Sequence, residues 1–242
     1  MLEKTLVMKF GGTSVGTAQA MQQVAAIVRK ELASWPQIVV VTSALSGVTN
    51  LLLDAATASA AGQAQAHKQA ANEIQKAHFR IAEKLIQDIV DESQTKEQIQ
   101  SLIADFSSLC QAIYILGEAT PRALDAVASL GERMSAILLS AVMRVYGIPA
   151  QSVEATRLVV TDDHFQAAVP LMDRTTQAVR QTLLPMLESG QVPVVTGFIG
   201  ATANGIVTTL GRGGSDYSAA ILGVALPAKE VWNYTDLDGV MT

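Results

Sequence analysis

The first residues that suggest chemistry form a glycine turn near the N-terminus. Lys9 lies close to the end of a β-type run, Gly11 and Gly12 follow, and Thr13 and Ser14 precede a helical pattern. Two glycines allow a tight turn whose backbone N–H groups face one point, and a helix start adds partial positive charge, which suits a phosphate. The P-loop pattern is absent. A plain turn beside a solvated lysine explains these residues about equally well.

A second glycine turn of the same kind lies near the other end of the chain. Its residues, in order, are Gly211, Arg212, Gly213, Gly214, Ser215 and Asp216. A guanidinium fork can hold a carboxylate or a phosphate through two parallel hydrogen bonds. A Rossmann fingerprint would need its third glycine where Asp216 stands. Helix capping by Ser215 explains part of the pattern, but it does not require three glycines around an arginine, so a ligand loop is favoured.

Two polar segments follow other strand-like runs. Ser43 and Thr49 belong to a hydroxyl-rich loop between a β-branched run and a helix, where an open α/β sheet has its substrate crevice. Helix capping alone explains them too. Thr235 and Asp236 end the last predicted strand. They suit a ribose or a metal-bound nucleotide, or simply an Asp-Gly turn.

One carboxylate, Glu132, falls inside an apolar helical pattern. If it is buried, it must be paired or functional, because burying an unpaired charge is costly. Arg122 and Arg133 are the structural partners that the sequence offers.

The two glycine turns and the hydroxyl loop each join the carboxyl end of a predicted strand to a helix. We therefore expect the three to converge on one crevice. Two anion-binding loops at one crevice favour phosphoryl transfer, in which catalysis consists largely of positioning and charge neutralisation. His67, His78 and His164 all lie away from these motifs, and no nucleophile–base pair is evident, which disfavours hydrolysis and acyl transfer.

The elements that position these motifs alternate between strand-like and helical patterns. Strands are predicted over 5–10, 38–42, 158–161, 192–198, 206–210 and 230–234. Helices are predicted over about 21–32, 49–56, 125–146, 169–187 and 216–226. Asn204-Gly205 is a hairpin signal before the strand over 206–210. Two long helices over about 64–116 should form a hairpin packed beside the sheet. The pattern predicts an α/β fold, a three-layer αβα sandwich with a mostly parallel central sheet.

The composition agrees with a globular chain. Of 242 residues 49% are hydrophobic and 16% are charged, the opposite of a disordered chain. A net charge of −5 lacks the basic excess of a nucleic-acid binder, so no nucleic acid is expected as partner. The one cysteine, Cys110, excludes a disulfide framework and is read as a buried hydrophobe, and no protein metal site is expected.

The apolar runs stop short of the roughly 18–20 residues that a membrane span needs. The N-terminus does not look like a signal peptide. We therefore expect a cytoplasmic protein with no membrane partner.

Six segments together resemble the motifs of aspartate kinases. They are residues 9–14, 43–50, 130–135, 197–200, 208–216 and 235–239. They occur in the family's order along the whole chain, and the opening Lys9–Ser14 motif separates aspartate kinases from acetylglutamate, glutamate, uridylate and carbamate kinases, which share the fold. The resemblance implies the amino-acid-kinase (carbamate-kinase-like) fold. It also implies transfer of the ATP γ-phosphate to the β-carboxylate of L-aspartate, giving 4-phospho-L-aspartate, the first step of lysine, threonine and methionine biosynthesis.

The resemblance assigns roles residue by residue. The catalytic residues would be Lys9, which neutralises the transferring phosphoryl group, and Asp216, which orients groups at the same loop. Arg212 would clamp the α-carboxylate of aspartate and Glu132 would bind its α-amino group. The residues that seat aspartate would be Ser43, Thr49, Glu132 and Arg212. The nucleotide-binding residues would be Lys9, Gly11, Gly12, Ser14, Gly213, Gly214, Ser215, Thr235 and Asp236, with Mg²⁺ carried by ATP.

The resemblance also predicts the domain organisation. Residues 1–242 would be one amino-acid kinase catalytic domain that is incomplete at its C-terminus, without the regulatory domains that usually follow. L-aspartate and ATP would be its partners, and a homo-oligomer is left open. Two alternatives remain: a non-catalytic nucleotide- or amino-acid-binding module of the same fold, and another amino-acid kinase such as acetylglutamate kinase. The joint presence of Lys9, Glu132, Arg212 and Asp216 favours the enzyme.

Overall fold

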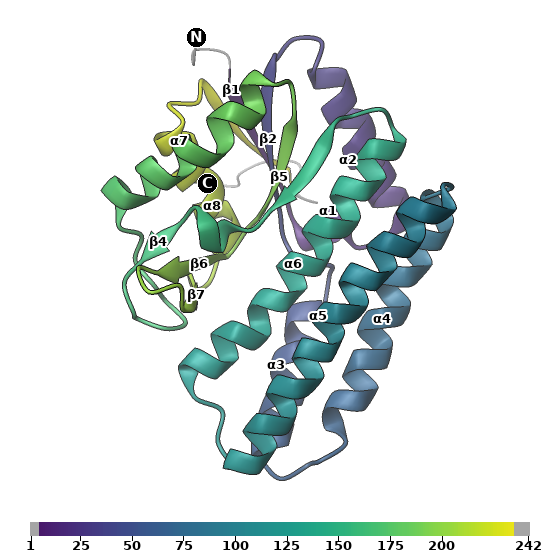
Figure 1. Ribbon diagram of the computed structural model, residues 1–242, viewed down its shortest axis with the longest axis vertical. Coiled ribbons are helices and arrows are strands. Elements are labelled where there is room, and N and C mark those ends of the chain that lie inside the picture. The colour runs from purple at the N-terminus through teal and green to yellow at the C-terminus, as the bar shows by residue number, and fades with distance from the viewer. Residues whose placement is uncertain (1–4, 235–242) are drawn as a thin grey trace, which may run out of the picture.

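A parallel five-stranded sheet forms the centre of the molecule, for which the computed structural model describes residues 5–234 (Figure 1). The strand order is β3-β5-β2-β1-β8. The strands are β1 (Thr5–Phe10), β2 (Gln37–Thr42), β3 (Ala150–Val153), β5 (Val192–Thr196) and β8 (Glu230–Tyr234). All neighbouring pairs run parallel, which confirms the predicted mostly parallel sheet.

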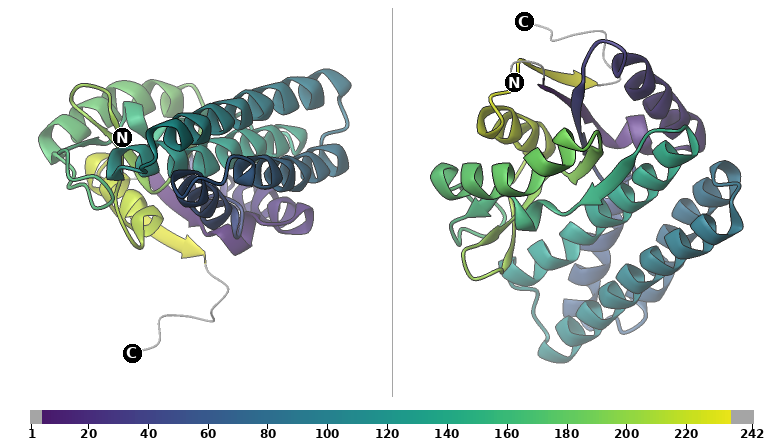
Figure 2. Two further views of the ribbon diagram at one scale, coloured as in Figure 1. Left: turned by 90° about the horizontal axis from the view of Figure 1, so that it is seen from below. Right: turned by 45° about the horizontal axis from the view of Figure 1, so that its top comes forward.

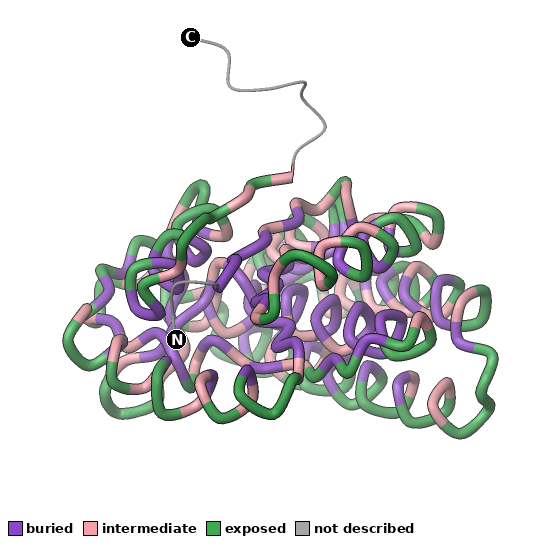
Figure 3. Tube along the Cα trace, turned by 90° about the horizontal axis from the view of Figure 1, so that it is seen from above, coloured by how far each residue is buried: buried purple, intermediate pink, exposed green. Residues whose placement is uncertain are grey.

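The central strands send alternate side chains into two separate cores. In β1, Leu6 and Met8 belong to one core and Val7 belongs to the other. All three side chains are fully buried, as they must be in a strand covered on both faces. Figure 3 shows buried stretches of the chain in the interior and exposed stretches along the outer helices. The predicted three-layer αβα sandwich is therefore confirmed.

Helices cover each face of the sheet. The larger core lies under α2 (Ala18–Glu31), α3 (Val48–Ala60) and α6 (Pro121–Val145). The smaller core lies under α7 (Met172–Glu188) and α8 (Gly214–Ala225). The first glycine turn leads into one short helix, α1 (Gly12–Val15), before α2 begins.

The predicted helical hairpin is present as α4 (Ala66–Leu85) and α5 (Ile89–Leu116). It packs chiefly on α3 and α6 rather than on the strands, and Figures 1 and 2 show it reaching away from the sheet. Its buried side chains, such as Ile74, Phe106 and Cys110, extend the larger core outward. The hairpin therefore forms a further helical layer on one side of the sandwich.

Two helices, α5 and α6, are long and apolar enough to cross a membrane by length and composition alone. Their most apolar windows have mean hydropathies of 1.3 and 1.4. The expectation that every apolar stretch is too short is therefore wrong for these two helices, because each contains an 18-residue window with at most two charged residues. In α6, 83% of the window is buried, as in the core helix of a globular protein, whereas in α5 the share is 33%.

A small second sheet, with strand order β4-β6-β7, carries the second glycine turn. Its strands are β4 (Val160–Thr161), β6 (Ile199–Thr202) and β7 (Val207–Thr209). The antiparallel hairpin predicted at Asn204-Gly205 joins β6 to β7, and Gly205 has a φ of 76° there. The strand predicted over 158–161 is shorter, because Leu158 is the C-cap of a 3-10 turn, η2 (Ala155–Arg157), and has helical rather than extended backbone angles.

Capping sets two helix starts differently from the prediction. α6 begins at Pro121 rather than at Asp125, because Thr120 caps it: Thr120 Oγ1 accepts the N–H of Ala123 at 3.2 Å. α8 begins at Gly214 with Gly213 as its N-cap, so Ser215 is not the cap that the sequence suggested.

Candidate active site

One cavity gathers most of the predicted site residues. It has a volume of about 300 Å³ and lies beyond the carboxyl ends of β1 and β2, beside the start of α8. The predicted residues that line it are Lys9, Ser43, Thr49, Glu132, Arg212, Gly213, Gly214, Ser215 and Asp216. Phe198 and Gly211 complete the lining. The structure thus brings together Lys9, the hydroxyl loop and the second glycine turn, although that turn follows the small sheet rather than the large one.

An ion pair joins β1 to the second glycine turn at this cavity. Lys9 Nζ lies 2.6 Å from Asp216 Oδ1. The Lys9 side chain is 12% exposed and that of Asp216 is 54% exposed. A largely buried ammonium is therefore held by a carboxylate that reaches in from solvent. A cation fixed in this way can stabilise negative charge that develops on a phosphoryl group.

Two left-handed glycines shape the second turn. Gly211 has a φ of 76° and Gly213 a φ of 75°, a conformation that other residues rarely adopt. They bend the chain from β7 into α8, so that the N-terminal end of α8 lines the cavity at Gly214 and Ser215. Because a helix N-terminus carries partial positive charge, this end suits an anion. Arg212, between the two glycines, is exposed and lines the same cavity.

The first glycine turn supports the cavity from outside. Gly11 and Gly12 are not among the residues that line it. A Cβ atom on Gly12 would lie 2.9 Å from the carbonyl oxygen of Ala44, so only glycine allows this approach. Ser46 donates its N–H to the Gly12 carbonyl at 3.2 Å. The turn therefore fixes the hydroxyl loop, and its contact with phosphate stays a prediction.

Ser14 lies in a neighbouring cavity of about 290 Å³. Phe10 and Tyr234 share this second cavity, and their rings stack with centroids 4.6 Å apart. Ser14 is therefore not in the lining of the cavity that holds Lys9 and Arg212, and its contact with the nucleotide stays a prediction. Thr235 and Asp236 lie outside the described residues.

Glu132 is a buried carboxylate with one unpartnered oxygen. It lies in α6 and is 3% exposed. Oε1 accepts the N–H of Ala44 at 3.3 Å, whereas Oε2 has no hydrogen-bond partner within residues 5–234. Arg133, one of its predicted structural partners, instead pairs with Glu154 at 2.8 Å, and Arg122 is exposed near the start of α6. A buried carboxylate with an open acceptor is suited to a cation.

Burial sets the protonation of this carboxylate. Removal from water raises the pKa of Glu132 from its ordinary value of 4.5 to about 8, and the hydrogen bond from Ala44 opposes this only in part. Without a ligand, Glu132 is therefore mostly protonated at neutral pH. A cationic ligand group would favour the ionised form and lower the pKa again.

We expect Glu132→Gln to remove a pH dependence of stability. Between pH 4.5 and about 8 the folded protein holds a proton on Glu132 that the unfolded chain has released, so stability falls as pH rises through this window. The variant should gain on the order of 2–4 kcal/mol relative to the wild type between pH 5 and pH 9. Urea unfolding at several pH values measures this, with the exposed Glu97→Gln as matched control. Parallel pH profiles for wild type and Glu132→Gln would contradict the assignment.

Phe198 is a site residue that the sequence did not single out as one. It lines the cavity with a φ of 68°, which is rare and strained outside glycine. Ser218 Oγ accepts its N–H at 2.9 Å, and its carbonyl accepts the N–H of Leu210 at 2.8 Å. A Cβ on Gly214 would lie 2.7 Å from the Phe198 ring, so the ring packs directly on the start of α8. The glycines on either side, at 197 and 200, were the only local signal.

The described residues offer no protein cage for a metal ion. Within residues 5–234, no group of three or more His, Cys, Asp or Glu side chains is placed to hold one. Asp216, the carboxylate at the cavity mouth, is engaged by Lys9.

Fold and cavity together define an α/β domain with a cavity, lined by Lys9 and Arg212, at the carboxyl edge of its parallel sheet. Comparison with known proteins agrees: the chain matches the amino acid kinase family over residues 4–242. The chain belongs to the amino acid kinase family.

Individual relatives are aspartokinases. The chain is 36% identical over 241 residues to the lysine-sensitive aspartokinase 3 of Escherichia coli, covering 100% of this chain and 51% of the relative. It is 34% identical to the aspartokinase of Chlamydia muridarum, with coverages of 98% and 49%. The crystal structure of E. coli aspartokinase III in complex with aspartate and ADP superposes with a TM-score of 0.87 and 34% identity over 97% of this chain and 50% of that one. This chain therefore spans about half the length of the relatives it matches.

Proposed function

We propose that this protein is an aspartate kinase, which transfers the γ-phosphate of ATP to the β-carboxylate of L-aspartate and forms 4-phospho-L-aspartate. Its family and its aspartokinase relatives support this proposal, as does the similarity to a structure that holds aspartate and ADP. The reaction would be the first step of lysine, threonine and methionine biosynthesis, in the cytoplasm.

The observation that carries the proposal is that Glu132 and Arg212 both line the same cavity. A free amino acid presents an ammonium and a carboxylate on the same carbon. The unpartnered acceptor of Glu132 suits the ammonium, and the guanidinium of Arg212 suits the carboxylate. Ser43 and Thr49 line the same cavity and would seat the substrate between them.

The same geometry disfavours N-acetylated acceptors. An acetylated amino group carries no positive charge, so it would leave a buried ionised Glu132 without a counter-charge. Acetylglutamate kinases share the fold, but phosphorylation of acetylglutamate is therefore the less favoured alternative for this protein.

In the proposed reaction the Lys9 ammonium neutralises the transferring phosphoryl group while Asp216 holds it in place. Gly213, Gly214 and Ser215 bind phosphate oxygens through the start of α8. The remaining predicted nucleotide contacts are Gly11, Gly12, Ser14, Thr235 and Asp236. Mg²⁺ would arrive on the ATP phosphates, since this ion commonly binds through substrate phosphates and one or two carboxylates. When bound, it would add positive charge at the transferring group.

Aspartate binding is expected to release a proton from Glu132. With a pKa of about 8 in the free protein, Glu132 is mostly protonated at pH 7, and the substrate ammonium would drive it to ionise. Affinity should then rise with pH up to about 8, by as much as about tenfold per pH unit. Titration calorimetry in buffers of different ionisation enthalpy counts the proton.

The comparison ligands are N-acetyl-L-aspartate and L-glutamate, and the control protein is Glu132→Gln, which has no proton to release. L-aspartate should bind more tightly than either ligand. Preferred binding of the acetylated ligand, or aspartate binding without proton release in the wild type, would overturn the substrate assignment.

A further inference from the structure

A second buried carboxylate on α6, Asp125, lies outside the cavity. It is 1% exposed and stands seven residues before Glu132, which is two helical turns along the same face. It is not among the residues that line the cavity. The role of Asp125 is therefore inferred from its hydrogen-bond partners.

Asp125 makes three hydrogen bonds, and all of them lead to loops. Its Oδ2 accepts the N–H of Gln166 at 2.9 Å and the N–H of Thr209 at 3.0 Å. Its Oδ1 accepts the hydroxyl of Thr209 at 2.8 Å. Thr209 is the last residue of β7 and stands two residues before Gly211, where the second glycine turn begins. The carboxylate thus ties α6 to the base of the turn that carries Arg212.

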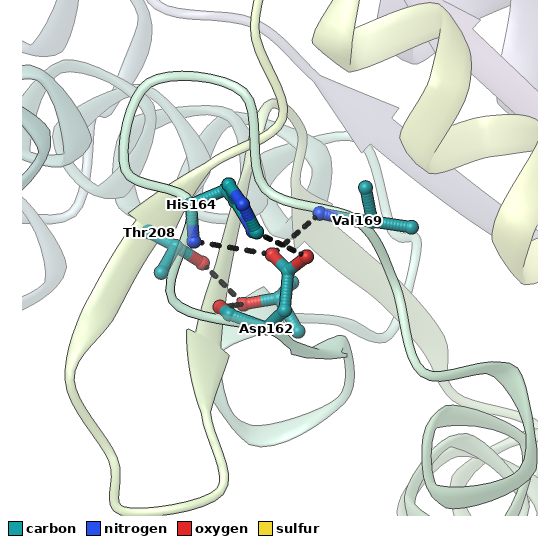
Figure 4. Close-up of polar contacts among 5 residues, drawn as sticks. Asp162, His164, Val169 and Thr208 are labelled. Atoms are coloured by element: carbon teal, nitrogen blue, oxygen red, sulfur yellow. Dashed lines mark hydrogen bonds and ion pairs between the residues drawn. The ribbon is translucent and has the colours of Figure 1, made fainter.

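The loop that contains Gln166 is itself braced. Asp162 Oδ1 accepts the N–H of His164 at 3.2 Å and the N–H of Val169 at 2.9 Å, and its Oδ2 lies 2.9 Å from His164 Nδ1 (Figure 4). Below it, the hydroxyls of Thr161 and Thr208 are 2.7 Å apart and link β4 to β7 (Figure 4). The loop is therefore closed on itself and anchored to the small sheet.

This braced loop touches the glycine turn directly. A Cβ on Gly211 would lie 3.1 Å from the Gln166 carbonyl oxygen, and Ala168 donates its N–H to the Thr209 carbonyl at 2.9 Å. Gln166 has a φ of 70°, a strained conformation that its bond to Asp125 helps to hold. The base of the Arg212 turn is therefore clamped between α6 and the loop over 162–169.

We propose that Asp125 is a positioning residue that fixes Arg212 relative to Glu132. One rigid helix carries both functions: Glu132 reaches the cavity itself, and Asp125 holds the turn that brings Arg212 to it. The spacing between the two substrate-binding charges is thereby set by α6. This inference rests on the proposed function, because it assigns Arg212 and Glu132 to the two ends of aspartate.

The test compares Asp125→Ala with Asp125→Asn. An asparagine carbonyl can accept both N–H groups, and the Thr209 hydroxyl can turn to accept from its amide, so the network survives in this variant. Asp125→Ala should raise the KM for aspartate by roughly 10- to 100-fold while the KM for ATP changes by less than about twofold. Asp125→Asn should stay within about threefold of the wild type. The exposed Asp105→Ala is the matched control.

A milder variant keeps the proposal testable if Asp125→Ala does not fold. Thr209→Val removes only the bond to Oδ1 and should raise the KM for aspartate by about three- to tenfold, and Thr209→Ser should restore it. In Asp125→Ala and Thr209→Val, hydrogen exchange should quicken in peptides over 205–217 but not in those over 40–50, whereas Asp125→Asn and Thr209→Ser should exchange like the wild type.

Two outcomes would overturn the inference. One is an unchanged KM for aspartate in Asp125→Ala at reduced stability, and the other is an equal rise in both KM values. Failure of the proposed function itself has a different signature, since the wild type would then show no preference for aspartate at all.

Discussion

A Lys9→Met protein is expected to keep its fold and to lose phosphoryl transfer by roughly 10³-fold in kcat. Methionine matches the length of lysine but carries no charge. The side chain of Lys9 is 12% exposed and its ammonium lies 2.6 Å from Asp216 Oδ1, so the charge is held at one place in the cavity wall. The substitution removes a fixed positive charge from the place where the phosphoryl group would be transferred. Water molecules would have to reorient to stabilise the same negative charge, so they cannot replace the fixed ammonium.

The loss should fall on kcat more than on stability. Asp216 is half exposed and can be hydrated when its partner is gone, and exposed ion pairs contribute about 0–1 kcal/mol. ADP release by a coupled assay measures turnover, and thermal unfolding checks the fold. Lys30→Met, at an exposed position on α2, is the matched control. If Lys9→Met kept more than about a tenth of wild-type kcat, the charge-neutralising role would be wrong.

Arg212→Ala should weaken aspartate binding by about 2–5 kcal/mol, because the α-carboxylate would enter the cavity without its counter-charge. Arg212 is exposed in the ligand-free structure, so its removal should leave the free energy of unfolding nearly unchanged. Binding energy and folding energy are therefore separable at this residue, which distinguishes a ligand clamp from a structural arginine.

Titration calorimetry with L-aspartate measures the loss, and Arg122→Ala on the exposed start of α6 is the control. Arg212→Lys should recover only part of the affinity, since an ammonium cannot make the two parallel hydrogen bonds of a guanidinium. Unchanged aspartate affinity in Arg212→Ala would refute the clamp. An equal loss in the Arg122 control would show that the effect is one of general charge.

The fold followed closely from sequence patterns. Continuous apolar runs such as Val39–Val41 predict strands buried on both faces, and the structure places these residues in a central strand between two cores. The Asn204-Gly205 turn and the second glycine turn were also recognisable, because the positive φ values at Gly205, Gly211 and Gly213 leave few alternatives to glycine. The first glycine turn needs glycine for a different reason, which is the close approach of the Ala44 carbonyl to Gly12. The packing partners of the α4–α5 hairpin could not be predicted from the sequence, because an apolar stripe on a helix does not show whether a strand or another helix covers it.

The loops that form the site were predictable from the sequence, but the spatial arrangement of their side chains was not. Lys9 and Ser43 lie at one crevice because they follow neighbouring parallel strands, as predicted, whereas Arg212 reaches the same crevice from the small sheet, which the sequence patterns did not separate from the large one. Ser14 lines a second cavity with Phe10 and Tyr234, and its contact with the nucleotide stays a prediction.

Burial and hydrogen bonding of single groups were beyond the sequence. Periodicity placed Glu132 on an apolar helix but could not show that Arg133 turns away to Glu154 and leaves Oε2 unpartnered. Phe198 and Asp125 depend on contacts between segments distant in the chain. Asp125 is 84 residues from its partner Thr209, and no local pattern encodes such a bond.

The central claim is tested most directly by trapping the phosphorylated product. The protein is incubated with ATP and Mg²⁺ and with L-aspartate, L-glutamate or N-acetyl-L-glutamate in turn, and hydroxylamine converts any acyl phosphate into a hydroxamate. The account predicts hydroxamate with aspartate, matched by ADP release, and far less with the other two acceptors. Greater hydroxamate formation with glutamate or N-acetylglutamate, or aspartate binding with no acyl phosphate from any acceptor, would contradict it.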